Sequence, residues 1–319
     1  MWIESLQPLP QPYRWAEFLA FHGRDASQRS ELLLAQQQRL YKALIWDGRP
    51  ALLVLDWDAQ QVRVRLQGTG RGGEERLQAM LKRMLGLAYP PAALERSQAG
   101  HAELGPLLAA QAGLHVPAAP TPFEALSWAI MGQQISVAVA VSLRRKLIEA
   151  AGVPLEPATQ KLLPEAADLL AYPDARRVAA LDLETLRALS FSQAKAQTLL
   201  AVARLAAAKT LPLDEWAWQS ARGLWDEAAV AEAERQLLAI KGIGPWTVNY
   251  CLLRGYGWPD GSLHGDVAVR RAMGLLMQKE KPDAAKPDAL QARLWLEQFK
   301  PWRALVAAHL WASLADQSY

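Results

Sequence analysis

A short glycine-containing turn constrains this chain more than any other feature of its sequence. Residues 237–248 read LLAIKGIGPWTV, with Gly242 and Gly244 between two apolar, helix-forming stretches. Glycine suits a turn that needs a positive φ or the close approach of another molecule. Pro245 fits the first position of a following helix, because its missing N–H has no partner there. The pattern predicts two helices joined by a tight hairpin, with free backbone N–H groups that can bind an anion such as phosphate.

Taken alone, the hairpin has a second interpretation. Short turns between helices often contain glycine simply because the helices pack closely. If the hairpin does bind a phosphate of a nucleic acid, the contact would position the partner without reading its bases. The rest of the chain has to decide between these interpretations.

Composition is that of an ordinary globular protein with two or three domains. Of its 319 residues, 51% are hydrophobic and 21% are charged, and the formal net charge is +3. Such a small excess of positive charge is weak support for a polyanionic partner. Any basic surface must therefore come from the arrangement of the charges.

Cysteine and histidine usage excludes several kinds of site. A single cysteine, Cys251, rules out a disulfide framework, a cysteine-rich zinc site and a four-cysteine iron–sulfur cluster, and it suits a reducing cytoplasm. The five histidines show no metal-ligand spacing, so we expect no cofactor and no metal held by side chains. The first residues lack signal-peptide features, and no apolar run is long enough to span a bilayer. We therefore expect a cytoplasmic protein without membrane contact.

The first hundred residues predict an α+β domain. Residues 51–57 are compactly apolar and residues 61–66 alternate, which predicts two strands joined by a turn at residues 58–60. Residues 75–87 have helical spacing and stop before a proline pair. Residues 68–73 match G-x-G-x-x-G, but no βαβ repeat follows and no acidic residue ends a strand at the expected offset. We interpret them as a flexible loop and not as a dinucleotide site.

From residue 100 the pattern is helical. The prolines of residues 117–122 indicate a domain boundary, and Thr121 with Glu124 predicts a capping box. Ser136 can cap the next helix and Gly152 can end it. A charged loop is predicted at residues 281–287. The predicted helices cover residues 137–151, 164–171, 183–189, 193–208, 228–240, 245–253, 267–277, 287–299 and 301–314.

The hairpin, the downstream Asp266 and residues 123–147 together resemble the helix-hairpin-helix DNA glycosylase superfamily. Within it, the chain resembles the bacterial DNA-3-methyladenine glycosylase II group over its whole length, including Tyr13 to Phe21 near its start. The resemblance implies a mainly α fold with two helical domains and an N-terminal α+β domain that contains an antiparallel sheet.

The resemblance also implies domain boundaries. They are residues 1–99 for the sheet domain, residues 123–258 for the helical domain with the hairpin, and residues 100–122 together with 259–319 for a discontinuous helical domain that carries Asp266.

Asp266 stands where the superfamily has its catalytic carboxylate. It directly precedes a predicted helix, so it should cap that helix, and capping could be its only role. A carboxylate at a helix N-terminus is favoured in its ionised form, and a negative charge stabilises the oxocarbenium-like sugar that forms when a base departs. The resemblance favours the catalytic role. His264 and Gly265 depart from the family pattern, which usually has proline or glycine and an acidic residue before this aspartate.

An aromatic base pocket is also implied, lined by Trp246, Tyr250, Trp311 and Phe21. Trp246 and Tyr250 are four residues apart, so they share one helix face; each of the four could instead be a core residue. Electron-rich rings attract cations, and N3- or N7-alkylated purines are cationic and leave readily. Bifunctional members of the superfamily have a Schiff-base lysine where this chain has Trp246, so hydrolysis of the N-glycosidic bond alone is implied.

The turn at residues 132–135 matches the family's wedge, which fills the space left by a flipped base. Bacterial relatives often have an apolar residue where this chain has Gln134, and glutamine could hydrogen-bond the unpaired partner base; a helix-breaking turn is the alternative. A monovalent cation on the backbone carbonyls of residues 239–243 is a further family feature. The residues that the resemblance assigns to DNA binding are Gln134, Ile135, Lys241, Gly242, Ile243, Gly244 and Thr247.

The predicted function is a monofunctional DNA glycosylase of base excision repair that flips and releases alkylated purines of the 3-methyladenine type. Its partner would be double-stranded DNA with damaged bases, and we expect a nucleoid-associated monomer. A glycosylase for another lesion, such as uracil or a deaminated purine, fits the same residues. A non-catalytic DNA-binding protein is the remaining alternative, but a phosphate-binding module needs neither Asp266 nor the aromatic residues.

Overall fold

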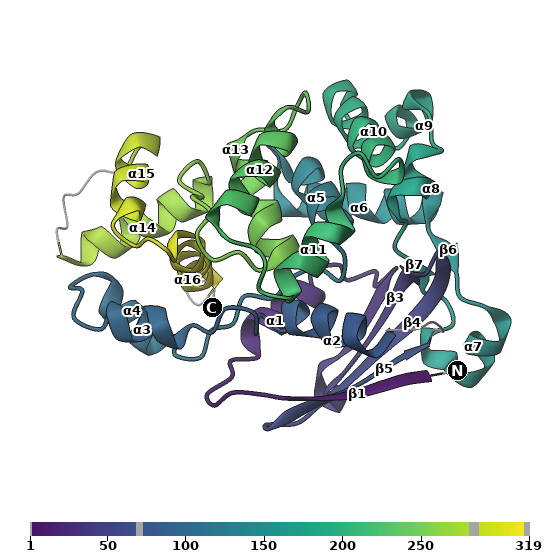
Figure 1. Cartoon of the computed structure of the whole chain (residues 1–319), viewed down its shortest axis with the longest axis horizontal. Helices are drawn as coiled ribbons and strands as arrows, with labels where there is room; N and C mark the ends of the chain where they lie inside the picture. Colours follow the sequence, from purple (N-terminus) through teal and green to yellow (C-terminus); the bar gives the residue numbers. More distant parts are fainter. Residues whose placement is uncertain (1, 68–72, 281–286, 316–319) are drawn as a thin grey trace.

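The computed structural model describes residues 2–67, 73–280 and 287–315. Figure 1 shows an antiparallel sheet beneath a larger helical body. The predicted fold class, mainly helical with an N-terminal antiparallel sheet, is confirmed. The loops predicted at residues 68–73 and 281–287 lie outside the described residues, apart from Gly73 and Pro287.

Five antiparallel strands form the sheet, in the order β1-β5-β4-β3-β2. The predicted hairpin is β4–β5, in which Leu53 lies opposite Leu66. Val62, Val64 and Leu66 of β5 are fully buried, as its alternating sequence predicts. The strands are β1 (Trp2–Pro8), β2 (Glu31–Leu34), β3 (Arg39–Trp46), β4 (Arg49–Trp57) and β5 (Gln61–Gln67).

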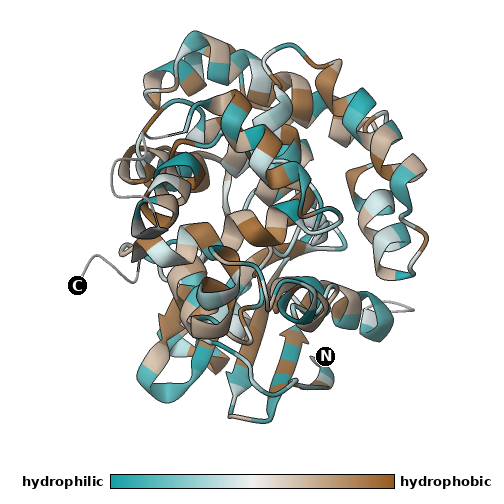
Figure 2. Cartoon of the chain, turned by 90° about the vertical axis from the view of Figure 1, so that its left-hand side faces the viewer, coloured by the Kyte–Doolittle hydropathy of each residue, from teal (hydrophilic) through white to brown (hydrophobic). Residues whose placement is uncertain are grey.

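Both faces of this sheet are covered. On one face, α1 (Ala16–His22) and α2 (Gly73–Met84) form an apolar cluster with the strands. On the other face, Tyr41 and Val54 pack against Leu155 and Leu169, which lie far along the chain. This double cover explains why β3 and β4 are apolar along most of their length, and Figure 2 shows the strands as largely hydrophobic ribbons.

The helical body has two further apolar clusters. One joins buried residues between 123 and 256, and the other joins residues 94–116 to residues 253–312. The body contains α3 (Ala92–Ser97), α4 (Leu104–Ala110), α5 (Pro122–Gly132), α6 (Val137–Ala151), α7 (Pro157–Leu162), α8 (Ala175–Ala179), α9 (Leu183–Ala188), α10 (Gln193–Ala207), α11 (Leu213–Ala221), α12 (Glu227–Leu238), α13 (Pro245–Cys251), a π-helix (Leu252–Tyr256), α14 (Val267–Glu280), α15 (Ala289–Glu297) and α16 (Arg303–Ala315).

The domain boundaries predicted from the sequence stay a prediction, because two groups of contacts cross them. Leu94, assigned to the sheet domain, packs in the second helical cluster. Leu155 and Leu169, assigned to the hairpin domain, pack on the sheet. The contacts between buried side chains therefore do not separate the chain at the boundaries that its prolines indicate.

The helix predicted over residues 164–171 is wrong. Pro164–Ala166 form a single 3-10 turn, and Leu170–Ala171 form β7, which pairs with β6 (Val153–Pro154). The Leu170 N–H donates to the Arg29 carbonyl at 2.8 Å, so packing against the sheet overrides the local helical pattern. Elements outside every predicted range include β1, β2, β3, β6, α1, α3, α4, α7, α8 and α11.

Two of the predicted helix caps are present, and the capping box is not. The Glu124 N–H donates to the Thr121 hydroxyl at 3.2 Å, and the Val139 N–H donates to Ser136 at 3.4 Å. The Glu124 carboxylate, however, does not return to the backbone of Thr121. It binds Lys42 and Arg144 instead, because two buried cations are stronger partners than one exposed N–H.

Candidate active site

Asp266 lies immediately before α14, and four N–H groups donate to its carboxylate. The backbone N–H groups of Ala268 and Val269 donate to Oδ1 at 2.8 and 3.0 Å, which confirms the predicted cap. The Trp311 indole also donates to Oδ1, at 3.2 Å, and the Trp246 indole donates to Oδ2 at 2.8 Å. Oδ2 has one protein donor, so it is the oxygen that is freer to face a substrate.

The four predicted pocket aromatics lie in one connected group. The ring centres of Trp246 and Tyr250 are 5.3 Å apart, and those of Tyr250 and Trp311 are 6.1 Å apart. Phe21 joins them through Arg254, whose guanidinium carbon is 5.0 Å from the Phe21 ring centre and 5.6 Å from that of Trp311. Trp246, Tyr250 and Trp311 remain partly exposed, so a ligand can reach them.

The two hairpin glycines have different roles in the fold. Gly242 has φ +90°, and an added Cβ would lie 2.0 Å from the Thr198 hydroxyl oxygen. Gly244 has an extended backbone with φ −110°, and an added Cβ would have nothing within 4 Å. The fold needs the first glycine, whereas the second leaves open space in front of α13.

The start of α13 has backbone donors and no side-chain cap. Its N-cap, Gly244, has no side chain, so the first N–H groups of the helix are left for another partner. Lys241 is exposed on the same hairpin. Ile243 and Thr247 are only 6% and 2% exposed, so they can contribute only backbone groups to a DNA contact.

The predicted wedge turn follows α5 and is tied to the hairpin. Gln134 is exposed, with φ +56°, and Ile135 is partly buried in the apolar cores. The Gln133 side-chain amide donates to the Gly242 carbonyl at 2.9 Å and to the Thr247 hydroxyl at 2.8 Å. Gln133 thus couples the hairpin to the predicted wedge turn, although the two are far apart in sequence.

Lys195 fixes the same turn from behind. Its ammonium, from α10, donates to the carbonyls of Ile130, Met131 and Gln133 at the C-terminal end of α5. This positive charge at a helix C-terminus also complements the helix dipole. Neither Lys195 nor Gln133 was predicted as a site residue, because their partners lie on distant segments that no local pattern indicates.

A buried ionic cluster joins the sheet to the helices beside the site. The Glu124 carboxylate accepts from Lys42 and from Arg144, each at 2.7 Å, and Glu31 accepts from Arg144 at 3.0 Å and from His22 at 2.9 Å. Burial acts to raise the pKa of Glu31, but Lys42 and Arg144 hold it well below its usual value. The cluster fixes α1, which carries Phe21, against α5 and α6.

Two other titratable residues near the site lie where burial favours the neutral form. Cys251 is fully buried, and burial raises the pKa of its thiol to about 12, so the thiol is inert. His264, two residues before Asp266, bonds the Ser262 hydroxyl at 3.0 Å. Burial and the surrounding arginines lower its pKa, which favours a neutral imidazole at neutral pH.

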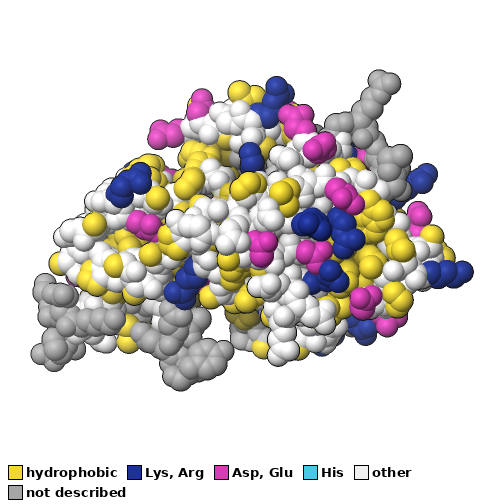
Figure 3. Space-filling view, turned by 90° about the horizontal axis from the view of Figure 1, so that it is seen from below, with side chains coloured by type: hydrophobic (Ala, Val, Ile, Leu, Met, Phe, Trp, Pro, Cys, Tyr) yellow, Lys and Arg dark blue, Asp and Glu magenta, His cyan; other side chains and the backbone are white. Residues whose placement is uncertain are grey.

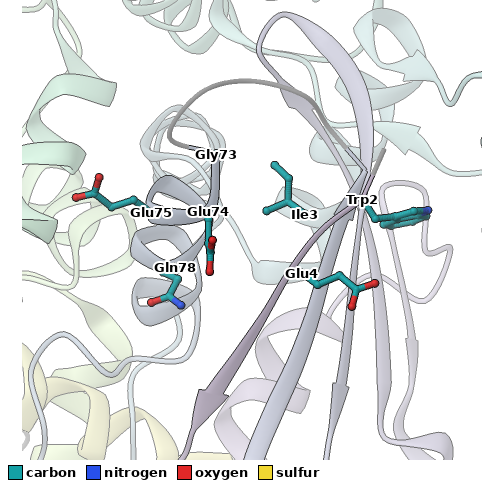
Figure 4. Close-up of a pocket in the computed structure, with 7 residues that line it drawn as sticks. All are labelled: Trp2, Ile3, Glu4, Gly73, Glu74, Glu75 and Gln78. Carbon is teal, nitrogen blue, oxygen red and sulfur yellow. The ribbon is translucent and has the colours of Figure 1, made fainter.

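Two surface hollows lie away from Asp266. One, of about 750 Å³, lies between β1 and the start of α2 (Figure 4), and its charged lining residues are Glu4, Glu74 and Glu75. An all-acidic lining does not suit a polyanion. On the face shown in Figure 3, basic and acidic side chains are interspersed.

The described residues contain neither a metal-ligand cluster nor a membrane-spanning helix. In the part of the chain that the structure describes, no cluster of three His, Cys, Asp or Glu residues could hold a metal ion. Over the same residues, no helix is long and apolar enough to cross a membrane. On the hairpin, the Lys241 carbonyl accepts from Thr198 and the Gly242 carbonyl accepts from Gln133. Each carbonyl oxygen keeps a second lone pair, so a monovalent cation on the hairpin stays a prediction.

Comparison with known proteins agrees with this geometry. Residues 127–297 match the family described as "HhH-GPD superfamily base excision DNA repair protein". The chain is 30% identical over 208 residues to DNA-3-methyladenine glycosylase 2 of Escherichia coli, covering 65% of this chain and 63% of that protein. It is 29% identical over 202 residues to DNA-3-methyladenine glycosylase of Bacillus subtilis, covering 63% of this chain and 60% of that protein. The alignments thus span about three fifths of these relatives.

A solved structure resembles the whole fold. The 3-methyladenine DNA-glycosylase from Archaeoglobus fulgidus superposes with a TM-score of 0.77 over 97% of both chains, at 21% identity. At this identity the likeness shows the fold alone.

Proposed function

Because the chain belongs to the HhH-GPD superfamily of base excision DNA repair proteins, we propose that it is a DNA glycosylase that hydrolyses the N-glycosidic bond of a damaged base. The proposed substrate is an alkylated purine of the 3-methyladenine type in double-stranded DNA, the lesion in the names of two relatives. The observation that carries the proposal is the Asp266 carboxylate, which two indoles hold beside an aromatic cluster.

In the proposed reaction, Asp266 stabilises positive charge on the sugar. As the C1′–N bond breaks, the electron pair leaves with the base and the sugar gains oxocarbenium character. The carboxylate is already oriented by four donors, so little reorganisation is needed when the charge develops. Water then adds to C1′ and loses a proton to solvent, which completes the hydrolysis and leaves an abasic site.

The proposed enzyme is monofunctional. Trp246 stands where bifunctional relatives have a lysine, and its indole is bonded to Asp266, so it supplies no amine for a Schiff base. We therefore expect borohydride to trap no covalent adduct between the protein and DNA.

DNA would be held by the hairpin and opened by the turn at Gln134. The free N–H groups of α13 and exposed Lys241 suit two neighbouring phosphates. Exposed Gln134 lies on the adjoining turn, where it could fill the space left by the flipped base. A monomeric, nucleoid-associated enzyme stays part of the proposal.

Product analysis tests the proposal directly. The purified protein is incubated with alkylated, deaminated and oxidised DNA, and the released bases are identified by chromatography. Release of 3-methyladenine supports the proposed lesion class, release of uracil or hypoxanthine alone would replace it with the other lesion class, and binding without release would leave a DNA-binding protein.

A further inference from the structure

The aromatic cluster next to Asp266 contains two arginines that the sequence analysis did not single out. Arg254 follows α13 in the π-helix, and its guanidinium faces Phe21 and Trp311. Arg24 follows α1, with its guanidinium carbon 4.3 Å from the Phe21 ring centre and 4.1 Å from that of Trp128. The rings expected to attract a cationic base therefore already contact two cations.

The two guanidiniums differ in what holds them. Nη1 of Arg254 donates to the Pro117 carbonyl at 2.7 Å, so this arginine is anchored. Arg24 makes no hydrogen bond and no ion pair with any residue in the described ranges, and its Nε is buried without a partner. Arg24 is nevertheless partly exposed, so a ligand can reach its guanidinium. An unsatisfied, partly buried guanidinium is expensive unless something else accepts its hydrogen bonds.

The position of Arg24 is on the base-binding side of the site. Its guanidinium contacts the rings of both Phe21 and Trp128, and Trp128 packs in one cluster with Ile135 and Tyr250. These residues link the predicted base pocket to the predicted wedge. Contacts with two rings restrict where the guanidinium can lie, whereas a phosphate contact on the surface would not need them.

Guanidinium chemistry selects one kind of purine edge. Arginine donates two parallel hydrogen bonds to O6 and N7 of guanine, whereas adenine presents an amino donor at position 6 and repels such a donor. A second positive charge also disfavours a cationic base relative to a neutral one. We propose that Arg24 is a specificity-determining residue that donates to the 6-carbonyl edge of a flipped purine, so that 6-carbonyl purines are favoured over 6-amino purines.

This inference rests on the proposed glycosylase function and concerns which purines the same site accepts beside 3-methyladenine. Hypoxanthine is a neutral 6-carbonyl purine, 7-methylguanine is a cationic 6-carbonyl purine in which O6 alone can accept because N7 is methylated, and 3-methyladenine is a cationic 6-amino purine. The three lesions therefore separate the effect of the purine edge from the effect of the charge.

The experiment compares single-turnover release of these three bases from otherwise identical duplexes. In Arg24→Met, the ratios of hypoxanthine to 3-methyladenine release and of 7-methylguanine to 3-methyladenine release should each fall about tenfold, the scale of one lost charge-assisted hydrogen bond. Arg49→Met removes an equal charge from an exposed position at the start of β4 and should leave both ratios unchanged. Thermal unfolding of each variant checks that it is folded.

Unchanged ratios in Arg24→Met would overturn the inference. An equal loss for all three bases, together with weaker binding to undamaged duplex, would also overturn it, because Arg24 would then be a phosphate contact. If Arg24→Met does not fold, Arg24→Lys keeps the charge but loses the planar fork and should lower both ratios in the same direction. A wild-type protein that releases none of the bases would instead refute the proposed function.

Discussion

The two sides of the candidate site are built differently. Around Asp266, side chains from distant segments converge, and the carboxylate receives donors from Trp246, Trp311 and the start of α14. The side that we propose to face DNA consists of two turns, at Gly242 and Gln134, whose backbone is fixed from behind while their outward positions stay open. This contrast distinguishes the proposed catalytic side from the proposed DNA-binding side. Changes around Asp266 should stop base release, and changes in the two turns should weaken DNA binding or base flipping.

The sharpest test of the contrast is Asp266→Asn. A negative charge about 4 Å from a developing cation contributes roughly 4 kcal/mol at an effective dielectric constant of 20. Neutralising it should slow single-turnover release by about a thousandfold. Affinity for undamaged duplex should stay near that of the wild type, because the hairpin is untouched.

Asparagine keeps the shape of the side chain but can turn an amide donor toward the Trp246 indole. Thermal unfolding therefore accompanies the kinetics, so that a loss of structure is recognised. Release within about tenfold of the wild-type rate, a barrier change of only about 1.4 kcal/mol, would contradict a catalytic role and leave Asp266 as a helix cap.

How far the sequence predicts this molecule depends on how local each signal is. The helix predicted at residues 137–151 is Val137–Ala151 in the structure, because Ser136 and Gly152 mark its ends in the sequence itself. The helix predicted at residues 164–171 is absent because the conformation of this segment depends on contacts with β3, more than a hundred residues earlier. Strands β1 and β3 were missed for the same reason, since their partners define them.

The same rule holds for the candidate site. Asp266 and Trp246 belong to a local motif, so the sequence predicts them together, although their hydrogen bond is visible only in the structure. Lys195 and Arg24 belong to no motif, and Gln133 lies in the turn that matches the wedge without being assigned a role there. Each of the three becomes informative only through contacts with remote segments.

The hairpin glycines give the next largest effect. Gly242→Val forces a branched side chain into a left-handed backbone and against Thr198, so we expect a loss of about 1–3 kcal/mol in unfolding free energy. In Gly244→Val the added side chain enters open space and the backbone is extended. We therefore expect only the effect of a weaker N-cap, a loss of up to about 1 kcal/mol in unfolding free energy. Gly244→Val should instead weaken binding to damaged and undamaged duplex equally.

Chemical denaturation and duplex binding, measured on both glycine variants, separate these outcomes. If Gly244→Val loses affinity only for damaged DNA, the hairpin belongs to the base pocket and not to the DNA-facing side. Equal losses of unfolding free energy in the two variants would contradict the different structural roles of the two glycines.

Lys195→Met tests whether the DNA-facing turn is held from behind. The substitution removes an ammonium from three carbonyls at the end of α5, and unmet buried acceptors should cost about 1–3 kcal/mol of unfolding free energy. Lys161→Met, at an exposed position on α7, is the matched control and should change stability by less than about 0.5 kcal/mol. If both variants unfold at the same denaturant concentration, the Lys195 contacts contribute nothing to the turn.

The smallest effect on stability is expected for Gln134→Ala, which tests the tip of the DNA-facing side. Gln134 is exposed and its side chain makes no hydrogen bond to any residue that the structure describes, so unfolding free energy should change by less than about 0.5 kcal/mol. As a wedge, however, it would offset part of the few kcal/mol needed to unstack a base. Release should therefore slow more for a lesion in a well-paired duplex than for the same lesion in a mismatch or a single strand, where less stacking is broken. Rates measured on these three substrates decide the point, since an equal effect on all of them would make Gln134 an ordinary turn residue and leave flipping to the rest of the site.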